Sequence, residues 1–227
     1  ENITFGGGGN TGIDAAGNSG TFVIAHDVTY AQAANFGSAN GGLAAITVNG
    51  GTSNFQQAVS GNVTVNAGQI TIGTDVLAGA GAGAGNLTVA GGIVAGVRNV
   101  TGHVAVDTGT VTQTGTVGGT LDVVNGGLYL GAVGADITGA VTINTANAGI
   151  NTFNDSNAGV ALVAGNLTMH DATTAGNVTV TNGALIMNDT TAGNLLVNGG
   201  TATIRNAVAN VAVDTGTVTQ TGTVGGT

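Results

Sequence analysis

Hydrophobic and polar residues alternate along most of the chain, in short runs that Gly and Asn separate. Residues 61–65 read GNVTV, and residues 70–72 read ITI after a turn. An alternation with a period of two is typical of a β-strand with one buried face. The pattern predicts pairs of short strands. In this pair the residues expected to be buried are Val63, Val65, Ile70 and Ile72, and those expected to face outward are Thr64 and Thr71.

The same unit returns at a regular spacing. Its first apolar residues Leu87, Val104 and Leu121 are 17 positions apart (104 − 87 = 17 and 121 − 104 = 17). The apolar face of one such rung is too small to fold alone, but rungs stacked in parallel share one core. We therefore predict an all-β fold, a parallel β-solenoid (β-helix) with about 17 residues per rung and about 13 rungs.

A repeat that is identical letter for letter supports stacking. The sequence VAVDTGTVTQTGTVGGT occupies positions 104–120 and again positions 211–227, an offset of 107 (211 − 104 = 107). The match extends weakly upstream, so that residues 97–120 correspond to residues 204–227. Repeats of this kind are typical of one-dimensional architectures.

Two parts of the chain depart from the regular pattern. Residues 1–60 contain four of the five Phe, and larger side chains suit broader rungs or an end cap. We therefore divide the chain into residues 1–60, as broader rungs or a cap, and residues 61–227, as regular rungs. The run AGAGAGAG at positions 78–85 adds about seven residues to its rung and predicts a flexible loop.

Composition and charge exclude several classes of function. The chain has 44 Gly, no Pro and no Cys, and its formal net charge is −9. Nucleic-acid binding needs a basic face, which two basic residues cannot form. No apolar run reaches the roughly 18 residues of a transmembrane helix. Without disulfides, backbone ladders and stacked side chains must stabilise the fold.

The tripeptide Asp-Thr-Gly begins at Asp107 and again at Asp214. Two such carboxylates sharing a proton form the site of aspartic proteases. Because both copies belong to the repeat, a solenoid would hold them several rungs apart, and we interpret each as a tight turn. No catalytic residues are predicted, and we expect the protein not to be an enzyme.

Metal and cofactor sites find little support in the residue pattern. Residues 6–14, GGGGNTGID, resemble a calcium-binding nonapeptide, but Thr11 stands where its Asp is required. A structural calcium ion is therefore a weak alternative here, and no other cofactor is expected. His26, His103 and His170 lack the spacing of metal ligands.

Two sets of polar residues are candidates for structural or binding roles. We expect the Asn of each Gly-Asn pair to stack as a side-chain amide ladder at a corner, beside a left-handed Gly. This set comprises Asn62, Asn86, Asn166, Asn177 and Asn194. The second set would form an outward row on one face, either a binding face or simply polar β-branched surface. It comprises Thr108, Thr110, Thr112, Thr114 and Thr116.

The run GGTLDVVNGGLYL at positions 118–130 and the repeated Gly-Asn-Val/Leu-Thr-Val resemble passenger regions of bacterial autotransporters and filamentous-haemagglutinin-like adhesins. The opening NITFGG at positions 2–7 is similar to large surface antigens of the rickettsial type. The resemblance implies a right-handed parallel β-helix that is exported and displayed on a bacterial cell surface.

These observations together favour a non-enzymatic extracellular structural protein, a stalk, fibre or surface layer. Few surface charges and unpaired strand edges favour self-association into a fibre or layer. The alternative is an adhesin that binds host glycans or proteins. A polysaccharide-acting β-helix enzyme is disfavoured, because its site would need clustered Asp beside basic residues, whereas Arg98 and Arg205 are repeat equivalents.

Overall fold

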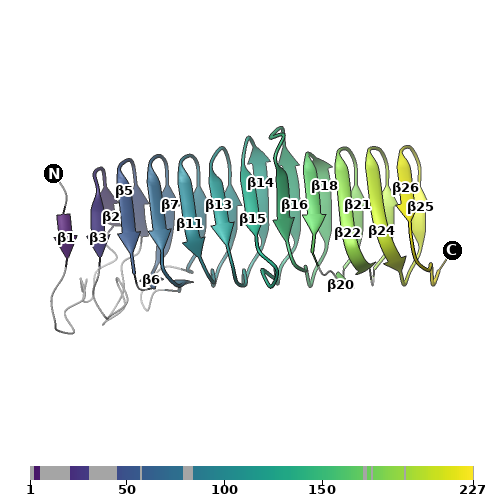
Figure 1. Ribbon diagram of the computed structural model, residues 1–227, viewed down its shortest axis with the longest axis horizontal. Helices are drawn as coiled ribbons and strands as arrows, with labels where there is room; N and C mark the ends of the chain where they lie inside the picture. The colour runs from purple at the N-terminus through teal and green to yellow at the C-terminus, as the bar shows by residue number, and fades with distance from the viewer. Residues whose placement is uncertain are drawn as a thin grey trace.

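The protein is an elongated stack of β-strands, shown in Figure 1 as a computed structural model. The structure describes residues 3–5, 21–30, 45–56, 58–78, 84–170, 173–174, 176–191 and 193–226. Within these ranges the chain is all-β and contains no helix. In Figure 1 the strands follow one another along the long axis in chain order, with the two termini at opposite ends.

Most strands belong to two large sheets. The 13-stranded sheet contains β1 (Ile3–Phe5), β3 (Val28–Tyr30), β5 (Thr52–Phe55), β8 (Gln69–Ile72), β11 (Ile93–Val97), β13 (Thr110–Gln113), β15 (Leu128–Gly131), β17 (Ile150–Phe153), β19 (Asn166–Met169), β20 (Thr173–Thr174), β22 (Ala184–Thr191), β24 (Thr201–Ala207) and β26 (Thr217–Gln220). The 11-stranded sheet contains β2 (Thr21–Ile24), β4 (Ala45–Val48), β7 (Asn62–Val65), β10 (Leu87–Val89), β12 (Val104–Val106), β14 (Leu121–Asn125), β16 (Val141–Thr145), β18 (Val160–Ala164), β21 (Val178–Val180), β23 (Leu195–Val197) and β25 (Val211–Val213). A short third sheet contains β6 (Val59–Ser60) and β9 (Val76–Leu77).

The strand pairs are parallel, and their register confirms the predicted solenoid. Leu87 pairs with Val104 and Val104 with Leu121, so neighbouring strands are 17 residues apart (104 − 87 and 121 − 104). Each rung gives one strand to the 11-stranded sheet, so the described residues contain 11 such rungs. The estimate of about 13 rungs was too high, because several rungs are longer than 17 residues.

The longer rungs lie in three places, two of them in the middle of the chain and one near the N-terminus. Val63 pairs with Leu87, an offset of 24 residues (87 − 63), so this rung holds seven residues more than its neighbours (24 − 17). Those extra residues fall in the predicted Gly-Ala loop, of which positions 79–83 lie outside the described residues. Leu130 pairs with Thr152, an offset of 22 (152 − 130).

Near the N-terminus the offsets are also long. Thr21 pairs with Ala45, an offset of 24 (45 − 21), and Val28 pairs with Ser53, an offset of 25 (53 − 28). Strands on both sides of residue 60 belong to the same two sheets. The division of the chain at residue 60 stays a prediction.

The inward side chains of successive rungs form one continuous apolar core. The four residues predicted to be buried in the pair β7 and β8 are fully buried, and the outward Thr64 and Thr71 are partly exposed. A third row of contacts runs from Val76 to Val100 and on to Val117 through isolated parallel bridges. Each buried Val, Leu or Ile contributes roughly 1.5–3 kcal/mol, so the stack is stabilised rung by rung.

Strand β17 shows that the most hydrophobic residues do not always point inward. Ile150 and Phe153 differ by three positions, so a strand cannot bury both on one face. Phe153 and Asn151 are fully buried, whereas the side chain of Ile150 is 51% exposed. The larger side chain, Phe153, fills the core, and Asn151 is buried with it.

From β4 onward, glycines stack at the corner between the end of each 11-stranded-sheet strand and the next strand of the 13-stranded sheet. Gly183 and Gly200 have left-handed backbones, with φ of 103° and 70°. A Cβ added to Gly183 would lie 2.0 Å from the carbonyl oxygen of Gly165, one rung earlier. The rungs therefore approach each other at this corner more closely than any side chain allows.

We predict that Gly183→Ala lowers the free energy of unfolding by about 2 kcal/mol or more, because Ala would be strained in φ and would contact a backbone atom. Gly126→Ala is the matched control, since a Cβ there meets nothing within 4 Å. Chemical denaturation of both variants measures the difference. Equal stabilities would show that the corner tolerates side chains.

Candidate functional site

The two Asp-Thr-Gly segments form the same turn in different rungs. Asp107 donates its backbone N–H to the carbonyl oxygen of Val89 at 2.8 Å, and the Thr108 hydroxyl donates to the carbonyl oxygen of Ala90. In the second copy Asp214 donates its N–H to Val197 at 2.9 Å, and the Thr215 hydroxyl donates to Asn198. The segment therefore joins two rungs at a corner.

The two aspartates are far apart. Strands β12 and β25, which precede them, are six steps apart in the strand order of the 11-stranded sheet. At ~4.8 Å per step the separation is about 29 Å, far beyond the contact that a shared proton needs. The Asp107 carboxylate accepts a hydrogen bond from the Asn125 side chain instead. These residues have the geometry of a turn.

An Asn ladder runs along the corner before the strands of the 11-stranded sheet. The Asn62 side-chain oxygen accepts the backbone N–H of Asn86 at 3.1 Å, and the Asn86 oxygen accepts the N–H of His103 at 2.8 Å. The ring Nδ1 of His103 then accepts the N–H of Thr120 at 2.9 Å. His103 thus takes the place of an Asn.

The ladder continues at the C-terminal end. Asn177 accepts the backbone N–H of Asn194 at 2.9 Å, and Asn194 accepts that of Asn210 at 3.2 Å. Each bond joins a side chain to the backbone, whereas the sequence suggested amide-to-amide stacking. The physical reason is that the corner leaves backbone N–H groups without a ladder partner, and the side-chain oxygens supply one.

Asn166 does not belong to this corner. It opens β19 in the 13-stranded sheet, where it pairs with Ile150 and Ala184. Its side chain donates to the carbonyl oxygen of Ala148 at 3.5 Å. The Gly-Asn-Leu-Thr pattern occurs in both sheets, so the letters alone do not tell which corner a given Asn occupies.

The predicted Thr row bends around a corner. Thr110 and Thr112 point outward from β13, whereas Thr108 lies in the preceding turn. Thr116 lies after the strand, and its hydroxyl donates to the Asn99 side chain at 3.0 Å. Thr114 also follows β13, so only two of the five residues share the flat face.

The structure also contains a polar cluster around Asp75 that the sequence did not predict. The Asp75 carboxylate accepts hydrogen bonds from Arg98 at 2.7 and 3.0 Å and from the Asn99 side chain at 2.8 Å. The Asn99 oxygen accepts the N–H of Thr116 at 2.9 Å in the next rung. The Arg98 guanidinium, the largest cause, holds the pKa of Asp75 below its ordinary value of 3.8. The sequence signal that could have indicated this cluster is the Arg-Asn pair at positions 98–99, which recurs at positions 205–206.

Three polar side chains lie together in the core. The Tyr129 hydroxyl donates to the Gln113 side-chain oxygen at 3.1 Å, and Asn151 accepts the backbone N–H of Tyr129 at 2.9 Å. The Gln113 amide donates to the carbonyl oxygen of Thr116 at 3.0 Å. Burial raises the pKa of Tyr129. Each member has a partner, so these hydrogen bonds connect rungs inside a mostly apolar core.

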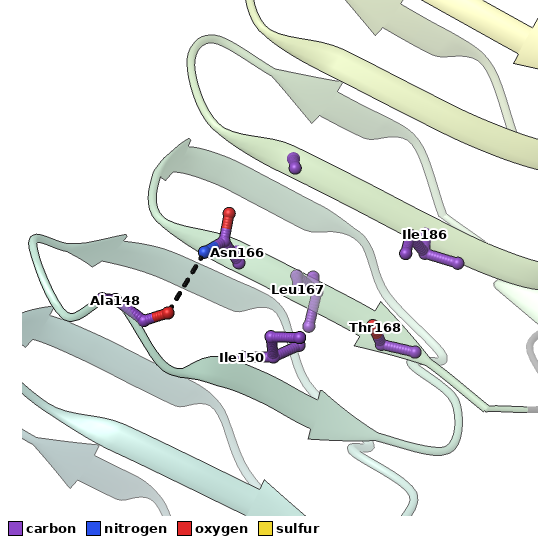
Figure 2. Close-up of a pocket in the computed structure, with 7 residues that line it drawn as sticks. Ala148, Ile150, Asn166, Leu167, Thr168 and Ile186 are labelled. Carbon is purple, nitrogen blue, oxygen red and sulfur yellow. Dashed lines mark hydrogen bonds between the residues drawn. The ribbon is translucent and has the colours of Figure 1, made fainter.

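The outer face of the 13-stranded sheet carries an apolar groove of about 320 Å³. Figure 2 shows Ile150 of β17 and Ile186 of β22 on either side of Leu167 and Thr168 of β19. Ile150 is 51% exposed and Ile186 is 41% exposed. The remaining lining residues are Ala148, Asn166 and Ala184, so the lining carries no charge.

The described part of the chain holds no group of three or more His, Cys, Asp or Glu side chains placed to bind a metal ion. The calcium-like residues 6–14 lie outside it. It also contains no helix long and apolar enough to cross a bilayer.

Comparisons with known proteins found no matching family model, no matching curated protein and no matching solved structure.

We predict that the Asp75 cluster stabilises the rod only while Asp75 is ionised. Because its folded pKa is lowered, this contribution is complete above its ordinary pKa of 3.8 and is lost as the pH falls through the folded value. The thermal midpoint of the wild type should therefore exceed that of Asp75→Asn at pH 7, and the gap should narrow below about pH 4. A gap that does not depend on pH would contradict this role of the charge.

Proposed function

We propose that the protein is a non-enzymatic structural rod that acts outside the cell as a stalk, fibre or surface layer. The observation that supports this most is the use of its polar side chains. The Asp-Thr-Gly turns, the Asn ladder and the Asp75 cluster all direct their hydrogen bonds to a neighbouring rung. Such groups maintain a long, regular shape.

The proposed location depends on the residue pattern. The repeated Gly-Asn-Val/Leu-Thr-Val and the run at positions 118–130 resemble autotransporter passengers and filamentous-haemagglutinin-like adhesins. A chain without Cys needs no disulfide formation during export. Only 6% of residues are charged, so most of the rod's surface offers neutral side chains for contact between rods, against the repulsion of a net charge of −9.

Electron microscopy of the purified protein at low micromolar concentration tests the structural role. We expect extended particles that associate into fibres or sheets, because the rod is long and most of its surface side chains are neutral. Antibody labelling of intact and permeabilised cells that express the protein tests the location, and equal labelling is expected. Dispersed compact monomers would count against assembly, and labelling only after permeabilisation would count against display.

The apolar groove favours a second candidate function, an adhesin that binds a host glycan or protein. The groove lies on the outer face of the 13-stranded sheet, and a mostly apolar hollow of this volume is typical of a binding site. A partner would contact Ile150 and Ile186 and would need no charge complementarity there. The face is continuous with the Thr110 and Thr112 positions of β13 in the same sheet.

Binding to host cells and to a glycan array tests this candidate. We expect Ile186→Asp to reduce retention at least about tenfold, because it would place a charge in the groove. The matched control is Val163→Asp, at an outward position that is 37% exposed on the other sheet. No retention of the wild type, or equal losses in both variants, would exclude the groove as the binding site.

A further inference from the structure

Asn-Gly pairs recur at the corners of the rod. They begin at Asn40, Asn49, Asn125, Asn182 and Asn198, and the first of them lies outside the described residues. In each of the other four pairs the Asn is exposed and lies at or just after the end of a strand of the 11-stranded sheet. An Asn before Gly is prone to deamidation, because the Gly backbone nitrogen carries no neighbouring side chain that hinders its attack on the Asn side-chain carbon. Sequence and exposure therefore do not separate these four sites.

Asn182 differs in the direction of the backbone N–H that follows it. The Gly183 N–H donates to the Asn182 side-chain oxygen Oδ1 at 2.9 Å. This hydrogen bond places the Gly183 nitrogen beside the carbonyl group that it would attack, and it directs the proton at the oxygen that would accept it. Reacting groups that are already oriented in this way need less reorganisation to react.

The Asn125 pair is held in the opposite way. The Gly126 N–H donates to the backbone carbonyl oxygen of Asp107 at 3.1 Å, so it points to the preceding rung. The Asn125 side-chain amide donates to the Asp107 carboxylate. Both reacting groups are therefore bonded to Asp107, and a reaction between them would first have to break both hydrogen bonds.

We propose that Asn182 is a site of spontaneous deamidation that the fold promotes. The Gly183 nitrogen forms a bond to the Asn182 side-chain carbon Cγ, and its proton passes to Oδ1. The bond between Cγ and Nδ2 then breaks, and Nδ2 leaves with that proton as ammonia, so that a succinimide ring remains. Water opens the ring to aspartate or isoaspartate. Either product adds one carboxylate to the outer corner of the rod.

The isoaspartate product would also change the corner itself. In isoaspartate the main chain runs through Cβ, which adds one carbon atom to the backbone before Gly183. A Cβ added to Gly183 would lie 2.0 Å from the carbonyl oxygen of Gly165, so the two rungs leave little room there. The inference depends on the geometry of this corner and not on the proposed extracellular role.

Incubation of the intact folded protein in a mildly alkaline buffer tests the site. Peptide mass spectrometry measures the converted fraction of each Asn over time, and Asn125 is the matched control inside the same molecule. We expect Asn182 to convert at least about tenfold faster than Asn125, because its reacting groups are already oriented. Asn182→Gln, whose longer side chain would need a larger ring, should abolish conversion at this position and leave conversion at Asn125 unchanged.

The same measurement in denaturant separates the effect of the fold from that of the local sequence. Both residues precede Gly, so their conversion rates should become similar once the hydrogen bonds of the corners are lost. The expected result is therefore a large difference in rate between Asn182 and Asn125 in the folded protein and a small one in the unfolded chain.

Conversion of Asn182 in the folded protein at the same rate as Asn125, or more slowly, would overturn the proposal. A difference in rate that persists unchanged in denaturant would also overturn it, since the local sequence and not the fold would then set the rate. Either result leaves the proposed structural role standing, because electron microscopy of the freshly purified protein tests that role separately.

Discussion

The structure depends on one constraint. Each rung must provide hydrogen-bond partners for the backbone N–H and C=O groups of the next rung, at the spacing of a parallel β-sheet. Because neighbouring strands lie about 4.8 Å apart, any side chain that points along the rod must either bond to the next rung or be absent. Asn86, which accepts an N–H from His103 at 2.8 Å, is an example of the first solution. Gly183, where a Cβ would lie 2.0 Å from the Gly165 oxygen, is an example of the second.

This constraint also explains why residues that resemble catalytic or metal-binding groups in the sequence form contacts between rungs in the structure. An Asp-Thr-Gly segment supplies a backbone donor, a short hydroxyl and a Gly, which together connect a corner to the preceding rung. His103 continues the Asn ladder because its ring nitrogen can accept the same N–H. In this stack, the hydrogen bonds that these polar side chains make are therefore set by the backbone groups of the neighbouring rung.

The groove is one of the places where the stack leaves apolar side chains uncovered. The groove arises because Ile150 and Ile186 point outward from strands whose inward positions are already filled. The groove is therefore a side-chain surface on the outside of the rod.

The sequence by itself determined the fold class, the rung length and most of the core, because period-2 alternation and a 17-residue spacing are local and repeated. It also located the longer rung between Val63 and Leu87. Where apolar residues occur on both faces of a strand, only the tertiary structure decided which face is buried. In β17, Phe153 is buried together with Asn151, and Ile150 is exposed. It likewise placed Asn166 in the other sheet and brought Asp75 to Arg98. The reason is that such contacts join residues that lie one rung apart. Because the rungs differ in length, the local sequence pattern does not predict which residues of neighbouring rungs are in contact.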